Sequence, residues 1–176
     1  MAAPANWASR SFDFPFEVDI YPSILMRLRG TPVRLEELLR EADDGAARRR
    51  PAEGKWSALE RAGHLIEVER LWEKRVGEYL AGAEQLAPAD MTNAVSTAAK
   101  YNERGVADVL AGFRQTRSAF LARLDALAPA DFARTALHPR LKIPMRLVDG
   151  LYFTAEHDDH ELAWIWELLR ETNLSR

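Results

Sequence analysis

The 176-residue chain contains no cysteine, and no apolar run approaches the length needed to cross a bilayer. The lack of cysteine excludes disulfides, thiolate metal sites and a protein-borne sulfur nucleophile, so any thiol chemistry requires a thiol cosubstrate. Residues 1–14 also lack the apolar segment of a signal peptide. We therefore expect a cytoplasmic protein with no membrane partner.

An excess of charge of one sign is absent as well. The 24 basic residues are scattered among 27 acidic ones, and the one basic run, Arg48–Arg50, is typical of a solvated loop. A nucleic-acid partner is therefore not expected, because the chain lacks a basic face. Its length and its 47% of hydrophobic residues predict a single domain, residues 1–176, with residues 1–20 as an N-terminal extension.

Few segments alternate with the period of a strand, whereas apolar residues recur at helical spacing in four long segments. Gly30 and Pro32 are expected to kink or interrupt the first, and residues 88–102 form a long connection. The string Leu-Ala-Pro-Ala-Asp occurs twice, at 86–90 and 127–131, as a helix-stop signal. The predicted helices are 21–42, 57–81, 105–127 and 144–171.

Local signals support two of these boundaries. Ser57 and Glu60 stand at the spacing of a capping box, and Pro144 suits the first turn of a helix. The last segment is apolar around much of its circumference, which favours packing by more than one neighbour, including a second subunit. The predicted fold is an all-α four-helix bundle whose connections permit more than one topology, and we expect a homodimer.

The chain has only four histidines, and three of them fall in the predicted helices. His64 lies at the margin of the apolar stripe of the second helix, where a lone histidine is more often a boundary residue than a ligand. His157 and Glu161 are four residues apart and project from one stripe of the last helix. A buried carboxylate there calls for a metal or a protonated partner, unless residues 156–161 are simply a solvated acidic patch.

Two histidines and a carboxylate on facing helices would form a three-ligand site with open positions, as catalytic metals use. Nitrogen and oxygen donors suit zinc, nickel, iron(II) or manganese. His160 lies one helical step to the side, as an alternate ligand, an outer-shell or proton-transfer group, or an exposed residue. His138, before Pro139, is expected to be a loop histidine, with proton acceptance at a pocket mouth as the alternative.

Better-known sites are excluded by their motifs. A di-iron carboxylate bundle needs paired Glu-x-x-His motifs, but the residues three before His64, His157 and His160 are Arg61, Thr154 and His157. The chain also has no Gly-x-Ser-x-Gly nucleophile elbow and no glycine-rich phosphate loop. The histidine and glutamate pattern is therefore the main functional signal.

Two stretches of the chain carry a family resemblance, Lys55-Trp56-Ser57 through Gly63-His64-Leu65, and Ala155 through His160. Together, in this order, they resemble the DinB/YfiT-like superfamily of four-helix metalloenzymes, over roughly residue 56 to the end of the chain. A third stretch resembles one subgroup of this superfamily. It consists of His138-Pro139-Arg140 followed by Pro144-Met145-Arg146 and Phe153.

The resemblance implies a divalent metal, often zinc or nickel, held by one histidine of the second helix and a His-x-x-x-His pair of the fourth. By position the ligands are His64, His157 and the residue four after it, which is Glu161 here. That departure allows a His-His-Glu site, a shifted site that recruits His160, or a weakened site without metal. We favour the first, because Glu161 stays on the stripe of His157 and a carboxylate is a competent ligand.

Characterised members of the superfamily include transferases and isomerases that use a low-molecular-weight thiol as cosubstrate. The resemblance therefore implies a metal-dependent enzyme acting on a small-molecule substrate, by thiol-dependent S-transfer or by hydrolysis. The alternative is a non-catalytic, stress-associated helical dimer that binds a ligand or partner and has a degenerate metal site.

Overall fold

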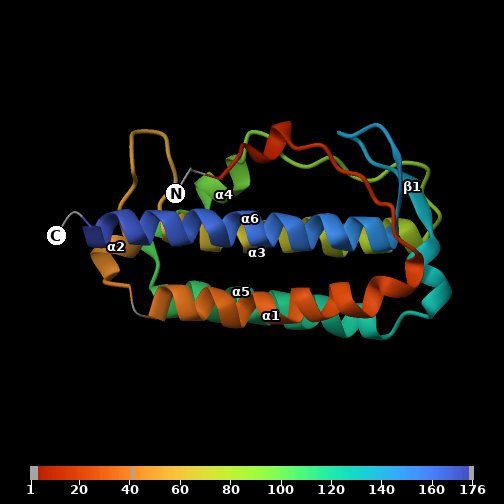
Figure 1. The fold of residues 1–176 in the computed structure, drawn as a ribbon, viewed down its shortest axis with the longest axis horizontal. Helices are drawn as coiled ribbons and strands as arrows, with labels where there is room; N and C mark the ends of the chain where they lie inside the picture. The colour runs from red at the N-terminus through yellow and green to blue at the C-terminus, as the bar shows by residue number, and fades with distance from the viewer. Residues whose placement is uncertain (1–3, 41, 175–176) are drawn as a thin grey trace.

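The structure, a computed structural model, describes residues 4–40 and 42–174, with side chains described up to residue 170. Four long helices form a bundle in which α6 lies beside α1 and α3, and α5 lies on the other side of both (Figure 1). The helices α1 and α3 therefore stand diagonally opposite each other, although they follow one another in the sequence. Their bounds are α1 Tyr21–Arg40, α3 Ala58–Leu80, α5 Val106–Asp125 and α6 Leu147–Leu174.

Short elements precede the first long helix and connect the long helices to one another. Two are α-helices, α2 Asp44–Arg48 and α4 Ala94–Ala98, and four are 3-10 helices at Trp7–Ser9, Val18–Ile20, Tyr101–Glu103 and Pro129–Ala133. Strands β1 Thr135–Leu137 and β2 Pro144–Arg146 pair in antiparallel register at one end of the bundle (Figure 1). The all-α bundle predicted from periodicity is confirmed, with this small hairpin as an addition. None of the described helices is long and apolar enough to cross a membrane.

Helix α1 continues through Gly30 and Pro32, so the predicted interruption is wrong. A proline inside a helix leaves the carbonyl four residues earlier without its usual donor. That carbonyl belongs to Leu28, and it accepts a hydrogen bond of 2.9 Å from Nη1 of Arg117 on α5. A buried side chain from another helix thus supplies the donor that Pro32 lacks.

The predicted start of the last helix at Pro144 is also wrong. Pro144 pairs with Leu137 in the hairpin, and α6 begins three residues later at Leu147. The Asp149 carboxylate accepts a hydrogen bond of 2.8 Å from the backbone N–H of Arg146, which satisfies a donor at the helix start. Sequence periodicity does not register a hairpin of two three-residue strands.

The start of α3 follows the prediction. Ser57 accepts from the N–H of Glu60, and the Glu60 carboxylate accepts from the N–H of Ser57. One turn into the helix, Gly63 makes room for the ring of Tyr101, which lies only 2.0 Å from where a Cβ would stand. The glycine therefore allows the connection between α3 and α5 to pack directly against α3.

The basic run predicted to be a loop begins inside a short helix. Arg48 is the last residue of α2, where it pairs with Asp44 at 2.7 Å and donates to the carbonyls of Asn102 and Arg104. Arg50 lies beyond the helix and pairs with Glu60. The run therefore has local carboxylate and carbonyl partners.

The N-terminal segment packs along the outside of α6. Its aromatic side chains Trp7 and Phe12 contact Phe153, with ring centroids 4.9 and 4.6 Å away. Arg10 forms an ion pair of 2.7 Å with Glu156 on the same helix. The segment expected to be an extension thus places Trp7 beside the part of α6 that carries the histidines.

The breadth of the apolar surface of α6 is explained within the chain. Helix α6 contacts α1, α2 and α3, and its inward residues belong to two clusters of buried side chains along the bundle. Trp166 remains 49% exposed on its outer side. A homodimer is therefore not needed to cover most of this helix, and it stays a prediction.

Candidate metal centre

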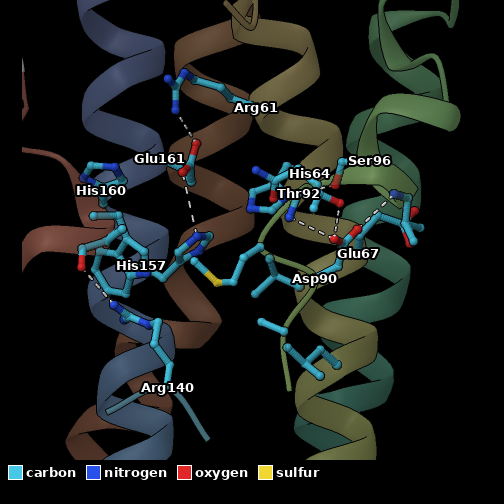
Figure 2. Close-up of a pocket in the computed structure, with 18 of the residues that line it drawn as sticks. Arg61, His64, Glu67, Asp90, Thr92, Ser96, Arg140, His157, His160 and Glu161 are labelled. Carbon is cyan, nitrogen blue, oxygen red and sulfur yellow. Dashed lines mark hydrogen bonds and ion pairs between the residues drawn. The ribbon is translucent and has the colours of Figure 1, made fainter. Parts of the chain in front are cut away.

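His64, His157 and Glu161 converge where α3 and α6 lie side by side. One possible ligand atom from each residue lies within 4.8 Å of those of the other two. Figure 2 shows His64 on α3 facing the two α6 side chains across the cavity. The spacing of four brings His157 and Glu161 onto one face of the helix, as periodicity predicted.

The contacts within this group are close but are not hydrogen bonds. Nε2 of His157 lies 3.7 Å from Oε1 of Glu161, and the rings of His64 and His157 meet edge to face with centroids 5.3 Å apart. The other ring nitrogen of His157, Nδ1, is buried without a hydrogen-bond partner. Buried polar atoms are normally paired, so this group is under-satisfied.

Ser96 orients His64 from the connection between α3 and α5. Its Oγ lies 2.9 Å from Nδ1 of His64, and a proton on Nδ1 would leave Nε2 free as a ligand atom. Ser96 is itself buried, on the short helix α4. Ser96 could not be predicted from the sequence, because no motif or spacing in this long connection indicates that its hydroxyl contacts His64.

Arg61 holds the carboxylate of Glu161 from one turn before His64 on α3. Its Nη1 donates to Oε2 of Glu161 at 2.8 Å, and its guanidinium lies 4.7 Å from the ring centre of Trp164. This leaves Oε1 facing His157 (Figure 2). The spacing of three between Arg61 and His64 places both on one side of the helix, and it is the sequence feature that points to Arg61.

Both candidate histidine ligands are neutral at physiological pH. Burial lowers the pKa of His157 to about 4, with Asp158 opposing the shift. Burial also lowers the pKa of His64 to about 4, and the neighbouring His157 adds to the effect. A neutral imidazole has a lone pair for a metal, so no proton need be displaced at pH 7.

The donor set therefore fits a divalent cation. It offers neutral nitrogens from His64 and His157 and one oxygen of Glu161, the composition of three-ligand sites that keep positions open. A cation would also explain why the buried pair of His157 and Glu161 stands close without a hydrogen bond. Within the described part of the chain, no other group of histidines and carboxylates has this geometry.

His160 lies apart from this group. It is half-buried and stacks at a tilt on Trp7, with ring centroids 5.6 Å apart. Burial lowers its pKa, so it is neutral at pH 7 and able to accept a proton. Its two roles, alternate ligand and proton transfer, stay predictions, but its position on the cavity wall suits the second better.

The candidate centre opens into a cavity of about 1310 Å³. Its wall comes from the N-terminal segment, α3, the connection through α4, the β1–β2 connection and α6. Several aromatic and basic side chains line this cavity. These residues are Trp7, Trp56, Arg61, Arg140, Phe153 and Trp164.

His138 lies in the connection between β1 and β2, as the sequence predicted, and it is also a buried part of this wall. It follows β1 directly, is 2% exposed, and lines the cavity with Arg140. Trp7, which contacts His157 at a centroid distance of 5.0 Å, was missed altogether. A tryptophan in an N-terminal segment carries no information about the helix on which it packs.

Comparisons with known proteins agree with this architecture. No curated protein matches the chain. Among solved structures, the chain is similar to YfiT from Bacillus subtilis, with 20% sequence identity, a TM-score of 0.79, and coverage of 93% of this chain and 94% of that chain. YfiT is described as a probable metal-dependent hydrolase with an unusual four-helix bundle topology. At this identity the likeness establishes the shared fold.

The family follows from the sequence comparison. The profile of the DinB superfamily matches residues 27–165, which span all four long helices in whole or in part and include His64, His157 and Glu161. The chain therefore belongs to the DinB superfamily.

Proposed function

We propose that this protein is a divalent-metal-dependent enzyme that acts on a small molecule, with the metal held by His64, His157 and Glu161. The observation that carries the proposal is the convergence of these three ligand atoms within 4.8 Å on the wall of a large cavity. The metal-dependent hydrolase description of YfiT supports the same class. Nitrogen and oxygen donors are compatible with zinc, nickel, iron or manganese, and the family resemblance favours zinc or nickel.

Thiol-dependent S-transfer is the reaction that we favour. A cavity of about 1310 Å³ exceeds the roughly 300–1,000 Å³ of ordinary small-molecule pockets, which leaves room for a cosubstrate beside the substrate. The chain has no cysteine, so the sulfur must come from a low-molecular-weight thiol. A bound divalent metal would supply Lewis-acid stabilisation of a thiolate or a hydroxide.

The chain's own residues divide the remaining work. Neutral His160 accepts the thiol proton, the sulfur then forms a bond to the electrophilic carbon, and the leaving group departs with the bonding electrons and regains a proton. Arg61 fixes the Glu161 carboxylate, and Ser96 fixes the ring of His64. Trp7 packs over His157 and His160 and shields them from water.

Hydrolysis is the second candidate, and the description of YfiT favours it. In that reaction water replaces the thiol as nucleophile, and His160 accepts the proton of water instead. The non-catalytic alternative has an observation of its own, since the Arg61 ion pair already satisfies one oxygen of Glu161. The three hypotheses, S-transfer, hydrolysis and a non-catalytic role, make different predictions for metal content and thiol consumption.

The test combines metal analysis with turnover. Protein purified without a histidine tag is loaded with zinc or nickel and assayed with a panel of low-molecular-weight thiols and activated electrophiles. We expect about one metal per chain and metal-dependent thiol consumption. Product release without thiol consumption would select hydrolysis, and a metal-free protein even after loading would contradict the proposal.

Two variants separate ligands from proton transfer. His64→Ala should abolish both metal retention and turnover. His160→Gln should keep the metal and lose about 10²- to 10⁴-fold in rate, the usual contribution of a general base. Loss of metal in His160→Gln would instead make His160 a ligand.

A further inference from the structure

A second polar corner of the cavity lies away from the candidate metal centre. It is formed by His138 and Arg140, in the connection between β1 and β2, with Arg75 of α3 nearby. Each of the first two residues has a buried nitrogen atom with no hydrogen-bond partner, Nε2 of His138 and Nη2 of Arg140. Such atoms on a cavity wall call for an explanation, because burying an unpaired donor is costly.

The unpaired nitrogen of His138 is a donor. The backbone N–H of Leu141 donates to Nδ1 of His138 at 3.1 Å, so Nδ1 must be unprotonated. Burial, together with the charges of Arg75 and Arg140, lowers the pKa of His138 to about 4, and the ring is neutral at pH 7. Its single proton therefore sits on Nε2, which needs an acceptor.

Arg140 also has a donor to spare. Its Nη1 donates to the carbonyl of Ala8 at 3.1 Å, whereas Nη2 is buried and unpaired. Arg75 directs both Nε and Nη2 to the carbonyl of Ala87. In the part of the chain that the structure describes, neither guanidinium forms an ion pair with a carboxylate. The positive charges of Arg75 and Arg140 thus lie near one another, and Glu78 opposes the charge of Arg75 without forming an ion pair with it.

The corner and the metal centre face the same space. The ring of Phe153 contacts both corner residues, with its centroid 5.4 Å from that of His138 and 5.7 Å from Cζ of Arg140. Phe153 precedes His157 by one turn of α6, a rise of about 6 Å along the helix. A single small molecule can therefore reach from the corner to the histidines.

We propose that His138 and Arg140, assisted by the charge of Arg75, bind a carboxylate of the small molecule whose reactive end faces the metal centre. A carboxylate brings one negative charge and two acceptor oxygens, one for each unpaired donor. Phosphate groups carry more charge and more oxygens than these donors match. The proposal deepens the proposed function by naming the substrate class, and the binding test below does not require the metal.

The test measures equilibrium binding of phenylacetate, whose ring suits the aromatic wall, by calorimetry and ligand-observed NMR. Phenylacetamide is the uncharged control for phenylacetate, and benzylphosphonate is the control that carries a different anionic group. We expect phenylacetate to bind about tenfold or more tightly than phenylacetamide, since hydrogen bonds to charged groups are worth at least this factor. Equal binding of the acid and the amide, no binding of phenylacetate, or tighter binding of benzylphosphonate would each overturn the proposal.

Variants assign the effect to the corner. Arg140→Gln removes the charge, and His138→Asn keeps an acceptor for the Leu141 N–H while it removes the Nε2 donor. Each should weaken phenylacetate binding at least several-fold. Arg134→Gln removes the charge of an exposed arginine that pairs with Asp131 outside the cavity, and it should bind as the wild type does. Circular dichroism and thermal melting check that each variant is folded.

Metal-free protein and His64→Ala separate the two proposals. If both still prefer phenylacetate, the carboxylate corner stands even when the metal centre fails. If the wild type binds metal but Arg140→Gln binds phenylacetate unchanged, the corner fails and the metal centre stands. Binding of phenylacetate that is lost in metal-free protein and unchanged in Arg140→Gln would place the carboxylate on the metal and overturn the corner.

Discussion

Two buried polar clusters both include residues of α3 and α6, and they differ in how well their atoms are paired. Asp158 and His157 are neighbours on α6, and because successive residues of a helix project about 100° apart, they face different surroundings. Asp158 faces the interior between α1 and α5, where it meets Arg117 and Thr31. His157 faces the cavity, where it meets His64 and Glu161.

The interior cluster is saturated. Arg117 donates to both carboxylate oxygens of Glu69, at 2.9 and 2.7 Å, to both oxygens of Asp158, at 2.8 and 3.2 Å, and to the carbonyl of Leu28 at 2.9 Å. Thr31 adds a hydrogen bond of 2.8 Å to Asp158. The two carboxylates raise the pKa of Arg117 despite its burial. This cluster needs no ligand, and it holds four helical segments together.

The cavity cluster is incomplete by the same standard. Nδ1 of His157 has no partner, and Nε2 stands 3.7 Å from Glu161 without a hydrogen bond. Burying such groups unpaired costs about 1–3 kcal/mol for each hydrogen bond left unmade. Burial of polar groups alone therefore does not indicate a metal site, whereas buried ligand atoms that are unpaired and lie beside a cavity do.

The largest expected effect comes from the interior cluster. Arg117→Met leaves Glu69 and Asp158 as uncompensated buried charges and leaves the Leu28 carbonyl unpaired beside Pro32. We expect the free energy of unfolding to fall by about 3–5 kcal/mol, as measured by urea denaturation. His157→Ala should cost about 1 kcal/mol or less in metal-free protein, because it removes an unpaired group. Equal losses in the two variants would break the comparison.

The pH dependence of stability sharpens the same contrast. His64, His157 and His138 have pKa values of about 4 in the folded protein, against about 6.5 when unfolded. Between these values the unfolded chain binds more protons, so stability is full above about pH 6.5 and falls as the pH drops toward 4.

From pH 7 to pH 5 we expect the free energy of unfolding of the metal-free protein to fall by about 2–4 kcal/mol. Each of the three histidines can contribute at most about 2 kcal/mol, so this is less than the sum of the three limits. Urea denaturation at both values measures it. His138→Asn should show a smaller loss than the wild type, since one of the three groups is gone. A free energy of unfolding that is the same at both pH values would contradict the neutral state of the buried rings.

The smallest effect concerns the partner of His64. Ser96→Ala removes the hydroxyl that lies 2.9 Å from Nδ1 of His64, while Nε2 and the other ligands are kept. We expect metal affinity to fall about tenfold, as is usual when a residue that hydrogen-bonds to a metal ligand is removed, with little change in the fold. Competition against a chelating dye measures the affinity. An affinity equal to that of the wild type would show that Ser96 does not orient the ring.

Much of the fold was accessible from the sequence because long helices leave a strong periodic signal. The capping box at Ser57, the bundle and the shared face of His157 and Glu161 all follow from spacing within one helix. The continuity of α1 through Pro32 did not, because it depends on a hydrogen bond from Arg117, 85 residues further on.

The candidate site divides in the same way. His64 and His157 were predicted from helical position together with the family resemblance, and the structure brings them together with Glu161. Their contacts with Ser96 and Trp7 come from a connection and from the N-terminal segment. Periodicity within a helix says nothing about which distant segment packs upon it, and these residues were therefore missed.

The central claim is that His64, His157 and Glu161, and not His160, hold a divalent metal. Anomalous diffraction at the metal edge, from crystals of zinc-loaded protein, tests it most directly. The account predicts one anomalous peak about 2.0–2.2 Å from a nitrogen of each of His64 and His157 and from one oxygen of Glu161, with His160 outside the coordination sphere. The absence of a peak at this position would contradict it. So would a metal bound by His160 while the Glu161 carboxylate forms only its ion pair with Arg61.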